Sequence, residues 1–127
     1  MVFFVRTSDN KNLIEIEVYW EENCTSNGAW YWSIDCHSYF YMKEFLQKFK
    51  DRSKFMNDKT LSEFIDDIDK IQQFRGYVHE TLNVNSKIDR YNINAKESHD
   101  WMCIVGKEAE ALLKSFCDKY GFYFNID

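Results

Sequence analysis

The chain of 127 residues contains no proline and only four glycines. At the average proline content of about 5%, a chain of this length would contain about six prolines. Its turns must therefore come from Asn, Asp and Ser residues and from the few glycines. No apolar run approaches the ~20 residues that a membrane-spanning helix needs, and no basic region precedes the short apolar run after Met1, unlike in a signal peptide. We therefore expect a cytoplasmic protein.

Metal-binding, phosphate-binding and catalytic motifs are missing as well. The cysteines and histidines show no Cys-x-x-Cys or His-Glu-x-x-His spacing and the glycines stand singly, so we predict no metal, no cofactor and no catalytic residues. In an extended strand, His99 and Cys103 would lie roughly 13 Å apart. A cysteine nucleophile with a histidine base, or His79 and His99 as an acid–base pair, stays open because such groups meet in space rather than in sequence. Without an export signal we expect four reduced cysteines: Cys24, Cys36, Cys103 and Cys117.

Basic residues are in the minority, and the formal net charge is −5. The chain therefore lacks the cationic footprint of a nucleic-acid binder, whereas an acidic surface favours basic partners. Six acidic and two basic residues give residues 1–37 a charge of −4, and five acidic and two basic residues give residues 60–85 a charge of −3. Residues 38–59 carry six basic and three acidic residues, which is +3. The acidic excess is thus concentrated in two segments.

Aromatic residues make up 18% of the chain, and they mark a strand over residues 29–36. Side chains alternate along a strand, so one face carries Trp30, Trp32, Ile34 and Cys36, and we expect this face to be buried. Residues 13–20 alternate in the same way, with Ile14, Ile16, Val18 and Trp20 on one side. With a first strand at residues 2–7 and a polar loop at 21–28, this pattern predicts an antiparallel meander.

After His37 the hydrophobic period changes from two to about 3.6, which is typical of helices. We expect Ser38 to cap a helix over residues 39–52, and Thr60-Leu61-Ser62-Glu63 to form a capping box for a second helix that breaks near Gly76. The remaining expected elements are strands at 88–95 and 100–105, a helix at 107–120 opened by Gly106 and capped by Gly121, and a strand at 122–126. The sequence predicts a single α+β domain over residues 1–127, with an antiparallel or mixed sheet and helices packed on one of its faces.

The other face of the sheet carries carboxylates and tyrosines. If the apolar residues of the two alternating strands face the helices, then Glu15, Glu17, Tyr19, Tyr31 and Asp35 share the opposite face. A second acidic strip follows in the capped helix, at Glu63, Asp66 and Asp67. Tyrosine is enriched at interfaces and carboxylates steer basic partners, so we predict that these residues bind a partner. The alternative is an ordinary solvated sheet face.

The size of the chain, its Asn-, Lys-, Asp-, Phe- and Tyr-rich composition, and acidic strands such as Glu15-Ile16-Glu17 and Tyr31-Trp32-Ser33-Ile34-Asp35 resemble small bacterial immunity proteins. These proteins neutralise toxins of polymorphic-toxin and contact-dependent growth inhibition systems. The resemblance implies a one-to-one inhibitor that blocks the active site of a cognate, basic, nuclease-type toxin and performs no chemistry itself. The alternative is a small-ligand-binding or hydrolytic α+β domain, with an aromatic pocket formed by Trp30, Trp32 and Trp101.

Overall fold

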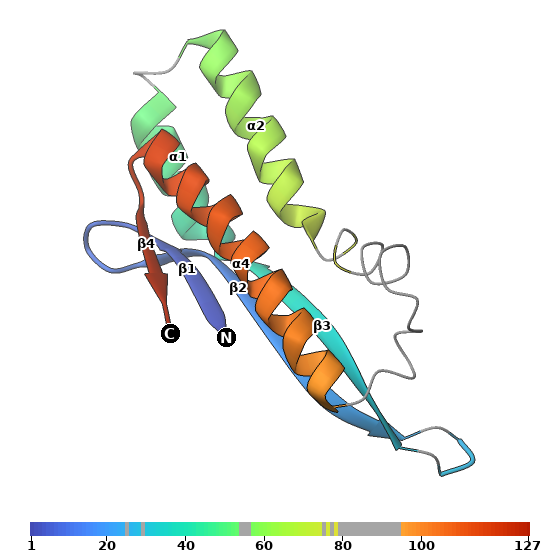
Figure 1. The fold of residues 1–127 in the computed structure, drawn as a ribbon. Coiled ribbons are helices and arrows are strands. Elements are labelled where there is room, and N and C mark those ends of the chain that lie inside the picture. Colours follow the sequence, from blue (N-terminus) through green and yellow to red (C-terminus); the bar gives the residue numbers. More distant parts are fainter. Residues whose placement is uncertain (25, 29, 54–56, 75, 77, 79–94) are drawn as a thin grey trace.

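The computed structural model describes residues 1–24, 26–28, 30–53, 57–74, 76, 78 and 95–127, without the side chains of 20, 21, 23, 30–34, 49–53, 58 and 95–98. Its elements, in chain order, are β1 (Val2–Arg6), β2 (Asn12–Cys24), β3 (Trp30–Phe40), α1 (Met42–Ser53), α2 (Asp58–Gln72), α4 (Ala95–Tyr120) and β4 (Tyr123–Ile126). They form a four-stranded antiparallel sheet with helices packed against it, which confirms the predicted α+β class (Figure 1).

The sheet has the strand order β3-β2-β1-β4, so the predicted meander is confirmed and β4 adds to its other edge. The predicted loop at 21–28 is wrong. Strands β2 and β3 stay paired as far as Cys24 and Trp30, and the turn between them contains Gly28 at a positive φ of 86°. This end of the hairpin projects past α4 (Figure 1). Among the described residues no helix covers it, so a strand there is able to carry polar residues on both faces.

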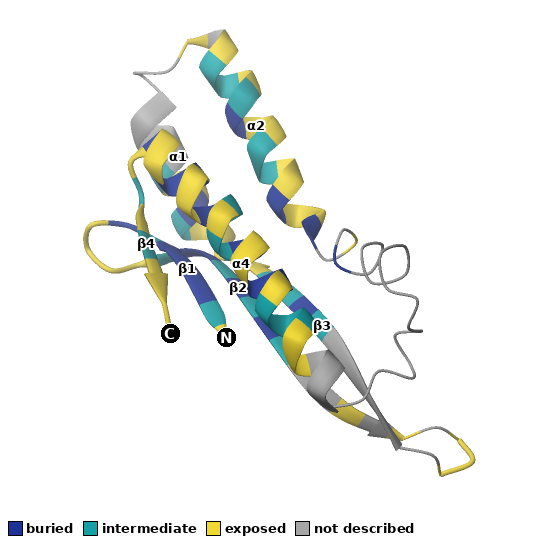
Figure 2. Cartoon of the chain, in the orientation of Figure 1, coloured by how far each residue is buried: buried dark blue, intermediate teal, exposed yellow. Residues whose placement is uncertain are grey.

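Burial along β2 follows the predicted alternation. Ile14, Ile16 and Val18 are fully buried, whereas Glu15 and Glu17 between them are partly exposed. Cys36 is also fully buried, on the face predicted for it. The predicted burial of the Trp20, Trp30, Trp32 and Ile34 side chains lies outside the described residues. Strand β1 is buried along most of its length (Figure 2) because it lies between two neighbouring strands and beneath α4.

The predicted strand at 100–105 is wrong, because these residues belong to α4, and Gly106 lies inside that helix rather than at its start. The apolar run around Trp101 fits a buried strand or a buried helix equally well by pattern alone. In the helix, Met102, Val105 and Ala109 recur at helical spacing and pack into the core. A Cβ atom on Gly106 would lie 3.1 Å from the Met1 sulfur, so the glycine lets the N-terminal residue approach α4 closely. The strand predicted at 88–95 lies almost wholly outside the described residues.

Helix boundaries also differ from the predictions in detail. Ser38 does not cap α1 but lies in β3. The predicted capping box at Thr60 is wrong: α2 begins earlier, and the Asn57 side chain accepts a hydrogen bond of 2.9 Å from the Thr60 amide. The break expected near Gly76 comes a few residues earlier, because α2 ends at Gln72 and Gln73 is its C-cap. The cap at Gly121 is confirmed by its φ of 73° and its 2.8 Å hydrogen bond to Cys117, and the predicted C-terminal strand is confirmed as β4.

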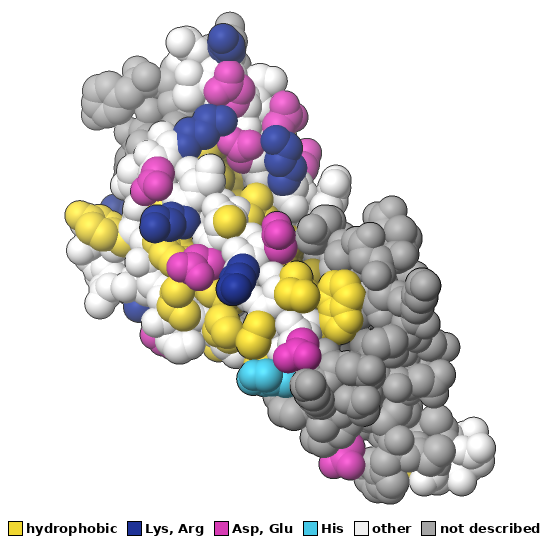
Figure 3. All heavy atoms as spheres, viewed as in Figure 1, with side chains coloured by type: hydrophobic (Ala, Val, Ile, Leu, Met, Phe, Trp, Pro, Cys, Tyr) yellow, Lys and Arg dark blue, Asp and Glu magenta, His cyan; other side chains and the backbone are white. Residues whose placement is uncertain are grey.

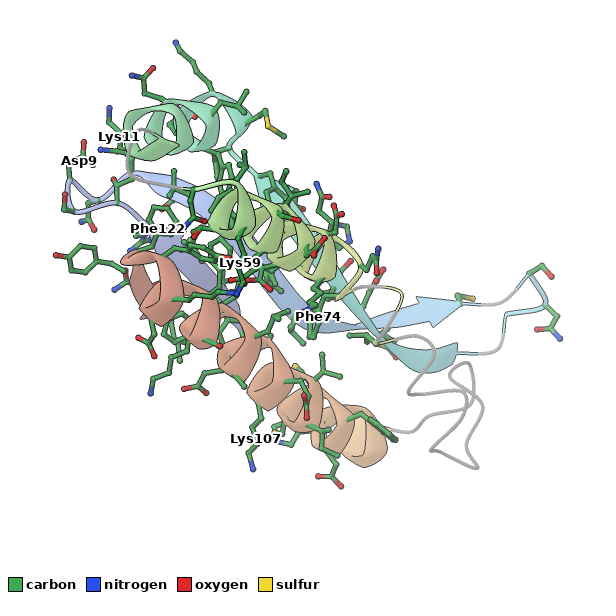
Figure 4. All side chains as sticks on the ribbon, turned by 90° about the horizontal axis from the view of Figure 1, so that it is seen from above. Asp9, Lys11, Lys59, Phe74, Lys107 and Phe122 are labelled. Atoms are coloured by element: carbon green, nitrogen blue, oxygen red, sulfur yellow. The ribbon has the colours of Figure 1, made fainter. Side chains whose placement is uncertain are left out.

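Aromatic rings join the helices to the sheet. Phe45 of α1 contacts Phe40 of β3 and Phe64 of α2, at centroid distances of 6.1 and 5.6 Å. Phe64 in turn contacts Phe116 and Tyr120 of α4, at 5.8 and 4.8 Å. The core therefore extends from one face of the sheet through α4 to α2. On the outer side of α4, Lys107 points away from the sheet (Figure 4).

Candidate functional site

The strongest candidate site is the face of β2 and β3 that is turned away from α4. In the register of these strands, Glu15 pairs with Tyr39, Glu17 with His37, and Tyr19 with Asp35, so their six side chains share one face. We call these six residues the outer face. It brings together four of the predicted partner-binding residues: Glu15, Glu17, Tyr19 and Asp35. The fifth, Tyr31, has its backbone paired with Asn23, and its side chain lies outside the described residues.

His37 organises the centre of the outer face. Its Nε2 lies 2.5 Å from the Tyr19 hydroxyl and its Nδ1 lies 3.2 Å from the Tyr39 hydroxyl. Each ring nitrogen of His37 thus has a tyrosine hydroxyl as its hydrogen-bond partner, and the tautomer of the ring sets which hydroxyl donates and which accepts. Both tyrosine rings also lie against the imidazole, at centroid distances of 5.2 and 5.9 Å. His37 therefore holds both tyrosine side chains in place.

The carboxylates of the outer face are held to different extents. Glu15 accepts a 2.6 Å hydrogen bond from the hydroxyl of Tyr41, the residue before α1, and this bond raises the pKa of Tyr41. Asp35 accepts a 2.8 Å hydrogen bond from the Cys36 amide and lies 3.9 Å from His37 Nε2. Glu17 lies between them, opposite His37 in the register. The outer face thus carries three carboxylates on two adjacent strands. Its six residues include no lysine or arginine, and His37 is their one basic side chain.

The geometry around His37 does not match a catalytic relay. A relay needs the orienting carboxylate and the nucleophile on opposite nitrogens of the imidazole. Here Asp35 and Tyr19 both approach Nε2, while Nδ1 faces Tyr39. The arrangement can orient aromatic rings and present negative charge, which are the properties of a recognition surface.

The second acidic strip does not join this face, because α2 lies on the helix side of the sheet. Asp67 accepts hydrogen bonds of 2.8 Å from Lys119 and 2.7 Å from the Tyr120 hydroxyl, and Glu63 lies 3.5 Å from Lys119. Burial alone would raise the pKa of Asp67, but the bonds from Lys119 and Tyr120 outweigh it and lower that pKa. Burial and the Asp67 carboxylate raise the pKa of Tyr120 to about 12. Glu63 and Asp67 therefore tie α2 to α4, and Asp66 alone of this strip is exposed.

The other candidate groups are scattered. Because α4 is a helix, His99 and Cys103 lie one turn apart, with 3.8 Å between Nε2 and Sγ, instead of at the extended spacing expected above. Trp101 on the same helix is half-buried, and His79 lies outside the described residues. Burial raises the pKa of the Cys117 thiol to about 12, which disfavours the thiolate form that a nucleophile needs. In the described part of the chain, no three His, Cys, Asp or Glu side chains come together as possible metal ligands.

His37, Tyr39 and Tyr41 were missed by the sequence analysis. Their signal was the alternation itself, since Asp35, His37 and Tyr39 continue the same odd-numbered face. The expected change to a helix at residue 38 hid this continuation, because β3 in fact runs to Phe40.

The helix side of the molecule differs in charge pattern. Over α2 and α4, basic and acidic side chains alternate (Figure 3), as on an ordinary solvated surface. None of the helices in the described ranges is both long enough and apolar enough to cross a membrane. Comparisons with protein families, with curated proteins and with solved structures find no match to this chain.

Proposed function

We propose that the protein is a binding module that captures a basic protein partner on its outer face and inhibits it, in the manner of a small cytoplasmic immunity protein. The observation that carries this proposal is the gathering of Glu15, Glu17 and Asp35 with oriented tyrosines on one rigid sheet. A single sign of charge on a fixed surface raises the local concentration of oppositely charged partners and speeds their association.

Tyrosines supply the part of the affinity that charge does not. Tyr39 is 45% exposed, so it has surface left to bury, and its hydroxyl is already held by His37. A side chain that is ordered before binding loses less conformational entropy in the complex. Tyr39 and Tyr19 are therefore proposed as anchors beside Tyr31, which the sequence predicts as an anchor. Glu63 and Asp67 are left out of the proposed interface because their carboxylates are paired inside the protein.

The partner that best fits such a face is a nuclease-type toxin. An enzyme that cleaves nucleic acid needs a basic surface to hold the phosphate backbone. A row of carboxylates on a sheet presents negative charge to the same surface, so binding would block the active site without any chemistry by the inhibitor. This is the partner that the resemblance to immunity proteins implies.

The test is affinity capture with charge-reversed variants. The wild-type protein, the triple variant Glu15→Lys/Glu17→Lys/Asp35→Lys, and a control with the same charge change on the helix side are immobilised and exposed to extracts of the native organism. The control variant is Asp100→Lys/Glu108→Lys/Asp118→Lys, at three exposed positions of α4. Circular dichroism checks that all three proteins are folded, and mass spectrometry identifies what co-elutes.

The wild type and the control should retain the same basic protein at one-to-one stoichiometry, and the outer-face variant should not. Removing one partner of a hydrogen-bonded charge pair that the complex buries costs about 2–5 kcal/mol, so the triple variant should bind at least ~100-fold more weakly. Association with the purified partner should slow as salt is added, since the Debye length is about 8 Å at physiological ionic strength. Equal capture by the outer-face variant, an acidic partner, or turnover of a substrate by the isolated protein would each contradict the proposal.

A further inference from the structure

Arg6 lies at the end of β1, beside the outer face and on the same side of the sheet. Strand β1 follows β2 in the sheet (Figure 1), and its Phe4 pairs with Glu15 of the outer face. Because side chains alternate along a strand, Phe4 and Arg6 both point to the side that Glu15 occupies. On the other neighbour of β1, Arg6 pairs with Tyr123 of β4, which is 58% exposed. Strand β1 therefore adds a basic group next to the carboxylates of β2 and β3.

The guanidinium group of Arg6 is held by two contacts. Its central carbon lies over the Phe4 ring, 4.2 Å from the ring centre, and this ring is only 8% exposed. Such a cation–π contact fixes the guanidinium flat against the ring. The Nε of Arg6 also donates a hydrogen bond of 2.7 Å to the Asn12 side chain on β2. With one side stacked and Nε bonded, the group presents the edge that carries its two Nη atoms.

This edge of Arg6 suits an anionic group with two oxygens. A guanidinium has five N–H donors, and the bond to Asn12 uses one of them. Within the described part of the chain, Arg6 makes no ion pair and no further hydrogen bond. Glu15, which pairs with Phe4, accepts its hydrogen bond from Tyr41 instead. The two parallel Nη donors match the two oxygens of a carboxylate, which a lysine ammonium group does not.

We propose that Arg6 binds a carboxylate of the basic protein that the outer face captures. This inference rests on the proposed function and names a group of the partner that gives specificity. A free anion fits less well, because Glu15 and Glu17 repel an ion that brings no positive charge of its own. A uniformly basic partner would in turn be repelled by Arg6. The partner that matches both signs of charge carries a carboxylate among its basic residues.

The geometry of the sheet sets the spacing of these two contacts. Neighbouring strands lie about 4.8 Å apart and alternate residues of a strand about 6.8 Å apart, so the backbones of Arg6 and Glu15 are separated by roughly 8 Å. The carboxylate of the partner should lie about this far from the basic group that meets Glu15. Nuclease-type enzymes offer such a pair, because carboxylates that hold a metal ion lie beside the groups that hold the phosphates. Binding of Arg6 to such a carboxylate would place the inhibitor on the active site itself.

Two short peptides test the site on the isolated protein. Acetyl-Lys-Asp-Lys-amide and acetyl-Lys-Asn-Lys-amide differ only in one carboxylate, and NMR follows the Nε–H signal of Arg6 as each is added. The Asp peptide should shift this signal in a saturable way, with a dissociation constant on the order of millimolar, and the Asn peptide should bind at least ~5-fold more weakly. Inorganic phosphate at the same ionic strength is the free-anion probe and should bind more weakly than the Asp peptide.

Variants of Arg6 separate the shape of its side chain from its charge. Arg6→Gln should lose the preference for the Asp peptide, and Arg6→Lys, which keeps the charge but not the planar fork, should lose most of it. The backbone amide signals of the outer face report binding in these variants. Lys11→Gln is the matched control and should keep the preference, because Lys11 lies in the connection after β1 with its side chain 64% exposed. Circular dichroism checks that each variant is folded.

The same variants are then measured against the partner captured from the native organism. Removing a cation would strengthen the binding of a uniformly basic partner, so the sign of the change is decisive. Arg6→Gln should bind at least ~10-fold more weakly than the wild type, and Lys11→Gln should bind like the wild type.

The outcomes separate this inference from the proposed function. Equal binding of the two peptides by the wild type, a preference that survives Arg6→Gln, or tighter binding of phosphate than of the Asp peptide would overturn the carboxylate site. Capture of the partner by Arg6→Gln at wild-type strength or above would also overturn it, while the carboxylates of the outer face keep their role. Capture that survives reversal of those carboxylates contradicts the proposed function, and the peptides then still decide whether Arg6 binds a carboxylate.

Discussion

The Asp67 carboxylate joins α2 to α4, and replacing it by an amide should lower the free energy of unfolding. The carboxylate accepts hydrogen bonds from the Tyr120 hydroxyl at 2.7 Å and from Lys119 at 2.8 Å. A hydrogen bond to a charged acceptor contributes about 1.5–3 kcal/mol, and Tyr120 is only 2% exposed, so its bond should have this weight. The Lys119 side chain is 43% exposed, so solvent screens its ion pair and this pair adds little to the stability. We therefore expect Asp67→Asn to cost about 2 kcal/mol.

The cost should depend on pH in a defined direction. The pKa of Asp67 in the folded protein lies below its ordinary value of 3.8, because the bonds to Lys119 and Tyr120 favour the charged form. A carboxyl group whose pKa is lowered by folding stabilises the fold above its unfolded pKa, and this stabilisation is lost as the pH falls through the folded pKa. The difference between the wild type and Asp67→Asn should therefore be full at neutral pH and shrink below about pH 4.

Urea unfolding followed by circular dichroism measures both effects. Tyr120→Phe and the double variant complete a cycle, and the double variant should lose less than the sum of the two single losses. Asp66→Asn, at the exposed neighbouring residue, is the control and should change the stability by less than about 0.5 kcal/mol. Losses at positions 67 and 120 that add within about 0.5 kcal/mol, or a cost that is as large at pH 3 as at pH 7, would refute the reasoning.

Two glycines and the cap of α2 give further predictions, all measured by the same urea unfolding. Gly106→Ala should raise the free energy of unfolding by about 0.5–1 kcal/mol, because alanine favours a helix and the 45% exposed end of Met1 is free to move aside. Gly28→Ala should lower the free energy of unfolding by about 1 kcal/mol, because φ at this position is positive. A loss of stability in Gly106→Ala would mean that the Met1 side chain is unable to move aside. Asn57→Ala should lower the free energy of unfolding by about 1 kcal/mol, because it removes the cap of α2, and Glu63→Gln should lower it by less than about 0.5 kcal/mol. A larger loss for Glu63→Gln than for Asn57→Ala would instead support the capping box predicted at Thr60.

The sheet was predictable because its strands have one face to bury. The alternation of Ile14, Ile16 and Val18 with polar residues fits a half-buried strand and no helix, so the pattern identified both the element and its buried face. The antiparallel pairing followed from the short connections. The length of the hairpin did not follow, since residues 21–24 are mostly polar and stay in the strand only because they pair with β3.

Helix α4 was half missed because its first part has no single apolar face. Trp101 and Ile104 are partly exposed, whereas Met102 and Val105 pack toward the core, so the short run is apolar in every direction. Such a run is compatible with a central strand or with a helix, and only the packing of the whole fold decides between them. The bond between Asp67 and Tyr120 joins residues 53 positions apart, and no local pattern contains it.

The candidate site was predictable as a face but not as a cluster. The alternation of side chains along β2 and β3 predicted that Glu15, Glu17, Tyr19 and Asp35 lie together, and the register confirms that these residues share a face. The imidazole of His37 between two tyrosines depends on the register of two strands, which the sequence does not state. The chemistry of the face is thus visible in the sequence, whereas the ordering of its aromatic rings needs the structure.

The outer face should also respond strongly to salt. It carries Glu15, Glu17 and Asp35 on adjacent strands, so a basic partner would meet several carboxylates at once. Exposed charges are screened at physiological ionic strength, whereas apolar burial is not. Added salt should therefore slow capture of the basic partner strongly, and an association rate that salt leaves unchanged would place the contact on apolar surface rather than on these carboxylates.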